Sequence, residues 1–406
     1  MNLETYCPIP YSEMFIRNDG RVLICCDTNQ IVGNIHENSL QEIFEQSFLV
    51  NLRKTFKNGE RHPICKKCWD REDNVGGSFR HNWIQDYNIE YISKGHYKTL
   101  EEFAENASTR IRKLKIDFSN ACNMKCPMCS ISRSTGWLKD WEKFNGMYSN
   151  STNSDLEYIS RPINEQAIYE TTAQLPISFI DDNWEIIRNA NLIDLSGGEP
   201  FYMPQVKHLL DRLEAESWDG YLKIITNASL IEPFIEQLRK FKCRLVISCD
   251  AYGEELYPVA RPVNGKQISW QEFVHVMQEL KDANIHHSHS YVPQLMNIHN
   301  IESWLDWCNS FYGRFVNTMI ALPLVKPDHL QISNYPDEEF KKNLSLRLGE
   351  RSVAWPDMHS MRALIASLRI KHNPNSYNNF LSYMEKLDSI RNTNFMDYWK
   401  SKTHRL

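Results

Sequence analysis

The cysteines constrain this chain more than any other feature. Eight of its eleven cysteines precede residue 130, in two groups. Clustered cysteines in a reducing compartment favour metal or redox chemistry over a disulfide framework. The first group is Cys7, Cys25, Cys26, Cys65 and Cys68, and the second is Cys122, Cys126 and Cys129.

Composition excludes several other classes. The 406 residues are 42% hydrophobic and 24% charged, which is ordinary for a globular protein of two or three domains. A net charge of −5 gives no indication of nucleic-acid or membrane-surface binding. Apolar runs are too short for a spanning helix, and the first residues lack a signal-peptide pattern. We therefore expect a cytoplasmic protein, without a membrane partner and with nucleic acid disfavoured.

The first part of the chain predicts a small α+β module that carries the first cysteine group. Asn18-Asp19-Gly20 predicts a turn, and residues 21–26 one arm of a hairpin. Ser39 and Glu42 form a capping box that opens a helix, for which Gly59 is the expected end. We expect this module to cover residues 1–75 and a connector to cover 76–110.

Beyond residue 111, strand and helix patterns alternate, which favours parallel βαβ units. Six strands suit an open, partial (β/α)6 barrel better than a closed barrel of eight. We expect this α/β barrel over residues 111–325, with an insertion at 136–175, and a C-terminal helical extension over 326–406. The predicted strands are 114–118, 192–196, 222–226, 245–248, 288–292 and 316–322. The predicted helices are 204–217, 230–241, 270–280 and 301–311, with Ser269 and Glu272 as a capping box on the third.

The second cysteine group reads Cys122-x3-Cys126-x2-Cys129, directly after the first barrel strand. Barrel enzymes place their chemistry at that end of a strand. Three thiolates can hold three irons of a [4Fe–4S] cluster and leave the fourth iron open to a small molecule. The alternative is a zinc loop completed by a fourth ligand, which is not obvious within the next twenty residues.

This segment resembles the radical S-adenosylmethionine (AdoMet) superfamily, whose hallmark is C-x3-C-x-φ-C with Met128 at the φ position. A Gly-Gly-Glu-Pro sequence after the next strand strengthens the resemblance, which covers roughly residues 111–325. It implies a [4Fe–4S] cluster on the three cysteines, and AdoMet bound to the open iron and cleaved by one electron to a hydrogen-abstracting radical. The AdoMet contacts that it implies are Met128, Ser196, Gly197, Gly198, Glu199, Thr226, Asn227, Ser248, Asp250 and Arg261.

Each of those contacts has a physical reason. Consecutive glycines permit a turn with positive φ and a close backbone approach to a ligand. Glu199 would steady that loop or meet the AdoMet ammonium. Polar residues at strand ends suit ribose hydroxyls, although such residues also commonly satisfy backbone groups. The same residues can therefore be structural.

The N-terminal segment resembles SPASM/twitch auxiliary-cluster modules. The ligands that this resemblance implies are Cys7, Cys25, Cys65 and Cys68, with Cys26 as a possible substitute for Cys25. Such modules usually follow the radical domain, whereas this one precedes it. Four thiolates would close a second [4Fe–4S] cluster and favour electron transfer. A structural zinc ion is the alternative. Trp69, Glu72, Ser78 and Arg80 resemble a stretch that recurs in such proteins and is expected to join the two domains.

Other chemistry-bearing residues are expected to be structural. His286, His287 and His289 predict a polar strand edge rather than a metal site. Cys243 and Cys308 are expected to be buried small hydrophobes, and Cys249 to point away from the barrel interior.

The leading hypothesis is a radical AdoMet enzyme that modifies a peptide or protein, with an electron donor such as flavodoxin or ferredoxin as partner. The substrate class rests on analogy with members that carry such modules. One alternative is radical chemistry on a small molecule such as a nucleoside, sugar or cofactor precursor. Another is a non-catalytic zinc-binding scaffold, which would leave the Gly-Gly-Glu-Pro sequence without a role.

Overall fold

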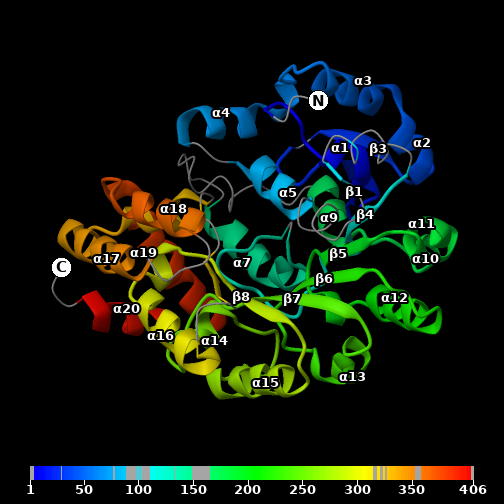
Figure 1. Ribbon diagram of the computed structural model, residues 1–406. Helices are drawn as coiled ribbons and strands as arrows, with labels where there is room; N and C mark the ends of the chain where they lie inside the picture. Colours follow the sequence, from blue (N-terminus) through cyan, green and yellow to red (C-terminus); the bar gives the residue numbers. More distant parts are fainter. Residues whose placement is uncertain are drawn as a thin grey trace. The chain divides into compact units, whose positions relative to one another are not determined.

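The structure is a computed structural model (Figure 1). None of the helices that it describes is long and apolar enough to cross a membrane. The structure does not describe every residue, and most of the expected connector, residues 76–110, lies outside the residues that it describes. These are 4–28, 30–75, 78–87, 98–99, 102, 110–131, 133–148, 165–313, 318–320, 323–324, 327–352 and 358–403.

The chain divides into two compact units, which are treated one at a time. Unit 1 comprises Met1–Ser119, Ala173–Lys223 and Lys240–Lys242. Unit 2 comprises Asn120–Thr172, Ile224–Arg239 and Cys243–Leu406. The boundaries expected from the sequence, at residues 75, 110 and 325, remain a prediction.

The sheet of unit 1 has the strand order β3-β2-β1-β4-β5-β6. As predicted, β1 and β2 form an antiparallel hairpin around Asn18-Asp19-Gly20, where Gly20 has φ +83°. β1 continues the sheet because it also pairs in parallel with β4, and β4 pairs in parallel with β5. The strands are β1 (Glu13–Ile16), β2 (Arg21–Leu23), β3 (Ile31–Asn34), β4 (Lys113–Asp117), β5 (Leu192–Ser196) and β6 (Tyr221–Thr226).

One helix expected in this unit is broken in two. The capping box of Ser39 and Glu42 is present, but the helix that it opens ends at Glu45. Gln46 has ψ 155°, an extended conformation that no α-helix accommodates, and a second helix follows it. The helices are α1 (Ile9–Ser12), α2 (Leu40–Glu45), α3 (Ser47–Lys57), α4 (Lys66–Val75), α5 (Phe79–Tyr87), α10 (Ser178–Asp182), α11 (Trp184–Arg188) and α12 (Pro204–Ala215).

Unit 2 contains the end of β6 and continues the order β6-β7-β8-β9. Both β7–β8 and β8–β9 are parallel pairs. The expected capping box of Ser269 and Glu272 opens α15. The strands are β7 (Lys242–Ser248), β8 (His287–Tyr291) and β9 (Thr318–Ile320), and the helices before the extension are α7 (Leu138–Tyr148), α9 (Glu165–Thr172), α13 (Ile235–Leu238), α14 (Tyr257–Ala260), α15 (Trp270–Asp282) and α16 (Ile301–Tyr312).

The helix expected over 230–241 is shorter than predicted. Pro233 lies in a 3-10 turn, Glu232–Phe234, and only α13 follows it. Proline has no backbone N–H to donate and favours the first turn of a helix over its interior, so the regular helix begins after it.

The C-terminal extension is helical, as predicted. Asn373 caps the N-terminus of its longest helix by accepting from two backbone N–H groups, and Asn392 ends that helix in the left-handed conformation. The helices are α17 (Glu338–Arg351), α18 (Met358–Leu368), α19 (Pro374–Arg391) and α20 (Phe395–Thr403). The parallel pairs β4–β5, β7–β8 and β8–β9, the intervening helices, the cysteine-bearing N-terminal module and the C-terminal helices confirm the predicted fold class.

Candidate functional site

The second cysteine group lies on the loop that follows β4, within unit 2. The loop is held by a short strand-like contact in which Met124 bridges Val263. Lys125 N–H donates to the Pro262 carbonyl at 2.9 Å, and Asn264 N–H donates to the Asn123 carbonyl at 2.8 Å. Because these are backbone bonds, the path of the loop is fixed independently of the cysteine side chains.

The three cysteines of the second group share one apolar cluster. Cys126 is buried in an apolar cluster with Met124 and Val263, and Cys122 and Cys129 pack against that cluster. In the described part of the chain, no three cysteine sulfurs lie within 4.8 Å of one another. A tetrahedral zinc ion with Zn–S bonds of about 2.3 Å holds its sulfurs about 3.8 Å apart. A cubane binds each thiolate to a different iron.

A buried cation lies against the central cysteine. Arg261 Nη1 donates to Cys126 Sγ at 3.3 Å, and its Nη2 pairs with Asp250 Oδ2 at 2.7 Å. Asp250 Oδ1 in turn accepts the Val292 N–H at 3.0 Å. The hydrogen bond from the Cys129 thiol lowers the pKa of Cys126, and the charge of Arg261 lowers it further. Burial alone would raise that pKa. The site therefore favours a thiolate, the form that binds iron.

The loop after β6 meets the same cysteine loop in unit 2. Asn227 Nδ2 donates to Asn123 Oδ1 at 3.0 Å and lies 4.0 Å from Cys122 Sγ. Ala228 has φ +61°, a left-handed conformation rare for a residue with a Cβ. Its N–H donates to Thr226 Oγ1 at 2.8 Å. Strain of this kind concentrates at ligand sites, which agrees with the predicted binding role of this loop.

The Gly-Gly-Glu-Pro segment lies in unit 1. Gly197 has φ +108°, and Gly198 N–H donates to the Ser119 carbonyl at 3.0 Å. A Cβ on Gly197 would lie 2.6 Å from that same carbonyl oxygen. Glycine is thus required at position 197 by both conformation and space, and Gly198 does not share its positive φ.

Ser196 and Glu199, on either side of the two glycines, both make hydrogen bonds within unit 1. Ser196 Oγ donates to Asp117 Oδ1 across the β4–β5 pair. Glu199 is fully buried, and its Oε1 accepts the Phe201 N–H at 3.2 Å, which caps the 3-10 turn Pro200–Tyr202. This cap corresponds to the first of the two roles considered for Glu199, that of steadying the loop.

The structure thus brings some predicted residues together and separates others by unit. Met128 Sδ accepts from Gln294 Nε2 at 3.3 Å. Ser248 lies at the end of β7, in register with Ser290 of β8. The residues predicted to contact AdoMet fall into two sets: Ser196, Gly197, Gly198 and Glu199 in unit 1, and Met128, Thr226, Asn227, Ser248, Asp250 and Arg261 in unit 2.

The first cysteine group lines one cavity in unit 1. Cys7, Cys25, Cys65 and Cys68 all contribute to its wall, and Cys26 does not. Burial raises the pKa of Cys25 to about 12. Burial, and then the neighbouring Cys25 and Cys68, raise the pKa of Cys65 to about 12. Four converging thiols, of which Cys65 is half-buried and the other three are buried, resist ionisation and fit a bound metal centre, which stabilises their thiolates.

Cys26 occupies a different environment from Cys25. It is exposed, and the charges that act on it are those of Lys115 and Lys113 on β4, with Glu13 on β1 and Asp27. The sequence left the choice between the two cysteines open, and this geometry favours Cys25.

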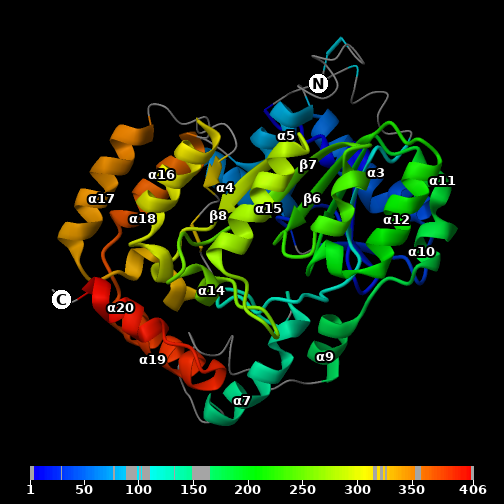
Figure 2. The same ribbon diagram turned by 90° about the horizontal axis from the view of Figure 1, so that it is seen from below.

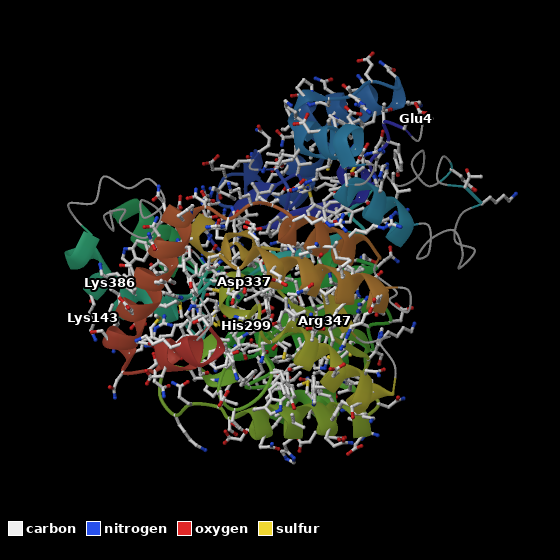
Figure 3. The ribbon with its side chains drawn as sticks, turned by 90° about the vertical axis from the view of Figure 1, so that its left-hand side faces the viewer. Glu4, Lys143, His299, Asp337, Arg347 and Lys386 are labelled. Atoms are coloured by element: carbon white, nitrogen blue, oxygen red, sulfur yellow. The ribbon has the colours of Figure 1, made fainter. Side chains whose placement is uncertain are left out.

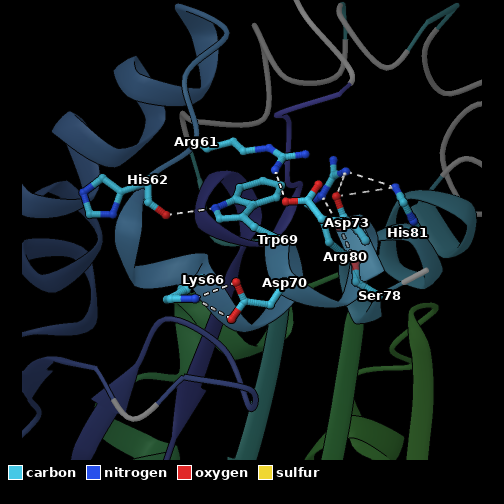
Figure 4. Close-up of polar contacts among 10 residues, drawn as sticks. Arg61, His62, Lys66, Trp69, Asp70, Asp73, Ser78, Arg80 and His81 are labelled. Carbon is cyan, nitrogen blue, oxygen red and sulfur yellow. Dashed lines mark hydrogen bonds and ion pairs between the residues drawn. The ribbon is translucent and has the colours of Figure 1, made fainter. Parts of the chain in front are cut away.

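A polar network holds the end of the cysteine module (Figure 4). Trp69 Nε1 donates to the His62 carbonyl at 2.9 Å. Arg80, which is 2% exposed, pairs with Glu72 at 2.7 Å and donates to the Tyr6 carbonyl at 2.6 Å. Ser78 Oγ also donates to Glu72. These contacts fasten α4 and α5 to the start of the chain inside unit 1, whereas the sequence led us to expect a junction between domains.

The prediction of a polar strand edge for the histidines near residue 287 is wrong. β8 is paired on both sides, and His287 and His289 are 3% and 0% exposed. Both Nε2 atoms hydrogen-bond to Tyr312 Oη on α16. The two side chains are thus tied to the helix layer. Cys243 and Cys308 are buried, as expected of small core residues, and Cys249 is buried as well.

One polar feature of unit 1 was not found from the sequence. Along β4, Leu114 and Ile116 are fully buried, while Lys113 and Lys115 are partly exposed on the alternate face. Lys113 pairs with Glu13 of β1 at 2.7 Å. The same face of the sheet carries a second pair, Asp194 and Lys223, 2.9 Å apart on β5 and β6. Alternating lysines on β4 were the available signal, and they mark a charged sheet face.

Two family profiles match the chain. The Radical SAM superfamily profile matches residues 116–309, and the SPASM iron–sulfur cluster-binding domain profile matches residues 7–69. No curated protein matches.

Solved structures give distant likenesses. One is native anSMEcpe with bound AdoMet and Cp18Cys peptide, at TM-score 0.39 and 15% identity, over 59% of this chain and 60% of that one. Another is Streptococcus suis SuiB bound to S-adenosylmethionine, at TM-score 0.37 and 12% identity, over 84% and 68% of the two chains. SuiB bound to its precursor peptide SuiA matches at TM-score 0.38 and 13% identity, over the same shares. This chain thus spans less than two thirds of the length of anSMEcpe.

Each profile accounts for one cysteine group. The Radical SAM match contains Cys122, Cys126 and Cys129, and the SPASM match contains Cys7, Cys25, Cys65 and Cys68. The corresponding cofactors are a [4Fe–4S] cluster with AdoMet and an auxiliary iron–sulfur cluster. The chain is a radical SAM superfamily enzyme with an N-terminal SPASM domain.

Proposed function

We propose that this enzyme cleaves AdoMet reductively on a [4Fe–4S] cluster held by Cys122, Cys126 and Cys129, and that it abstracts hydrogen from a peptide or protein substrate. When bound together, the reduced cluster and AdoMet supply one-electron chemistry that yields methionine and a 5′-deoxyadenosyl radical. The protein's part is to hold the cofactors, to exclude water and to present the substrate.

The observation that carries the proposal is the cysteine loop with its buried cation. Three thiolates on one loop leave one iron of a cubane without a protein ligand. Arg261 lies against Cys126 at 3.3 Å and offsets thiolate charge in a buried place.

Residues in each of the two units have the chemistry that AdoMet needs. Gly197 keeps the backbone free of a side chain, which suits a close approach by the methionine moiety. Asn227 offers amide groups beside Cys122. Asp250 and Arg261 form a buried ion pair, which holds the guanidinium in one orientation.

We assign Cys7, Cys25, Cys65 and Cys68 as ligands of the auxiliary cluster. Four cysteine ligands would leave no iron open, so this cluster suits electron transfer better than substrate binding. Such a cluster can receive the electron that many radical modifications release, or pass one on from an external donor such as flavodoxin or ferredoxin.

The peptide substrate is the finer part of the proposal. It is supported by the resemblance to SPASM-type proteins, many of which modify ribosomally made peptides. Radical modification of a small molecule is the competing assignment, and product analysis with candidate substrates separates the two.

The test starts from anaerobically reconstituted protein. Wild type should hold about eight irons and the Cys122/Cys126/Cys129 triple alanine about four. Dithionite and AdoMet should give 5′-deoxyadenosine with wild type and none with Cys126→Ala. Cys308→Ala is the matched control, because Cys308 is equally buried and lies on α16, outside both cysteine groups. Deoxyadenosine from Cys126→Ala at the wild-type rate would refute the assignment.

A further inference from the structure

Helix α19 of the C-terminal extension lies beside α7, and both belong to unit 2 (Figure 2). Lys386 on α19 and Lys143 on α7 mark the two helices in Figure 3. α7 begins just after the cysteine loop, so a helix near the end of the sequence runs close to that loop.

The middle of α19 contacts the loop directly. Tyr383 is 2% exposed, and its Oη donates to the Pro127 carbonyl at 2.6 Å. Pro127 follows Cys126 in the sequence. The Tyr383 ring is fixed by the His329 ring, whose centroid lies 4.7 Å away, and by Phe144 of α7 at 5.7 Å. Because the Tyr383 ring packs against both of these rings, the carbonyl that its hydroxyl binds is held as well.

The end of α19 is connected to Lys125, the residue before Cys126. Arg391 Nε donates to Asp140 Oδ2 at 2.7 Å, and Asp140 Oδ1 accepts from Lys125 Nζ at 3.1 Å. The Arg391 and Asp140 side chains are 4% and 5% exposed. Lys125, which is half-buried, precedes Cys126, so this chain of charges restrains the loop just before that cysteine.

Arg391 is also connected to Cys126 itself, through Trp137. The Arg391 guanidinium lies over the Trp137 ring, 4.4 Å from its centroid, and Trp137 Nε1 donates to the Cys126 carbonyl at 3.0 Å. The residue before Cys126, its own carbonyl and the residue after it are therefore all connected to α19.

We infer that α19 sets the geometry of the cysteine loop, with Tyr383 and Arg391 as positioning residues that act through Pro127, Asp140 and Lys125. This inference rests on the proposed function, since it takes the loop to hold a cluster. Groups around the ligands of a metal orient those ligands and tune the retention and potential of the centre. The extension thus supports the cysteine loop as well as completing the fold.

The experiment compares Tyr383→Phe and Arg391→Lys with Tyr377→Phe in the full-length, reconstituted holoenzyme. Tyr377 lies on the same helix, and its hydroxyl accepts from Trp399 rather than contacting the loop. Iron release to a ferrous chelator and the EPR spectrum of the reduced clusters are measured. The Cys122/Cys126/Cys129 triple alanine identifies the signals that belong to the loop.

Tyr383→Phe leaves a buried carbonyl without its donor, so we expect iron release from the loop to quicken at least about five-fold. The EPR spectrum of the loop cluster should shift, and the auxiliary iron should leave at the wild-type rate. Arg391→Lys keeps the charge and loses the planar fork, so it should act in the same direction and serves if Tyr383→Phe does not fold.

Loop iron that leaves both variants at the rate of Tyr377→Phe, with an unchanged spectrum, would overturn the inference. A wild-type protein whose iron content is the same as that of the triple alanine would instead refute the proposed function, and the inference with it. The two failures are distinguished before any α19 variant is compared.

Discussion

Gly197→Ala tests the geometry of the Gly-Gly-Glu-Pro loop. Gly197 has φ +108°, and an added Cβ would lie 2.6 Å from the Ser119 carbonyl oxygen. Contacts below 3.0 Å are essentially never made by real Cβ atoms, so the backbone must move. The carbonyl that it displaces is the one that accepts the Gly198 N–H at 3.0 Å.

Two costs add up in this variant. A residue with a side chain in this sparsely populated backbone region costs about 1–3 kcal/mol. Weakening of the Gly198 hydrogen bond adds about 0.5–1.5 kcal/mol. We expect the free energy of unfolding to fall by about 2–4 kcal/mol. Ser119 lies three residues before Cys122, so AdoMet affinity should fall as well.

The control is Gly265→Ala. Gly265 has φ +112°, nearly that of Gly197, but an added Cβ would meet no atom within 4 Å. It therefore carries the backbone cost without the clash. Urea unfolding followed by far-UV circular dichroism measures stability, and isothermal titration calorimetry measures AdoMet binding. If the two variants lose equal stability, the steric argument for position 197 is wrong.

Three further predictions test other parts of the structure. Cys25→Ser should lose about four irons while Cys26→Ser keeps them, as iron analysis after reconstitution will show, because only Cys25 lines the cavity of the first cysteine group. Burial lowers the pKa of His329 to about 4, so unfolding takes up a proton below about pH 6.5; stability should fall by up to about 3 kcal/mol between pH 6.5 and pH 4. His329→Phe should flatten that part of the stability–pH curve, and an unchanged slope would contradict the assignment. Asp250→Asn leaves the Arg261 charge buried without its partner, so the free energy of unfolding measured in urea should fall by about 3–5 kcal/mol.

Local signals in the sequence predicted their elements well. The strand predicted at 192–196 coincides with β5, and both capping boxes are formed. These features depend on residues a few positions apart, so the sequence displays them directly. The cysteine loop belongs to the same class, because its spacing is a local property.

Predictions that depended on tertiary context were less successful. The apolar face that continues from α2 into α3 gave no sign of the extended residue Gln46 between them. The histidines of β8 look like a polar edge in sequence, yet Tyr312, more than twenty residues later, supplies the partner that lets both be buried. A buried polar group is tolerated only when it is hydrogen-bonded, and its partner can come from anywhere in the chain.

The support of the cysteine loop shows the same limit at the site itself. Tyr383 and Pro127 are 256 positions apart, and Tyr383 lies outside the motifs found in the sequence. A tyrosine in an amphipathic helix is ordinarily core packing, and only the position of its hydroxyl distinguishes it from its neighbours on α19. Cysteine spacing thus states which residues can bind a cluster, whereas the groups that orient those cysteines are set by long-range packing. For that reason the ligands of this site could be proposed from the sequence, and the helix that we infer to position them could not.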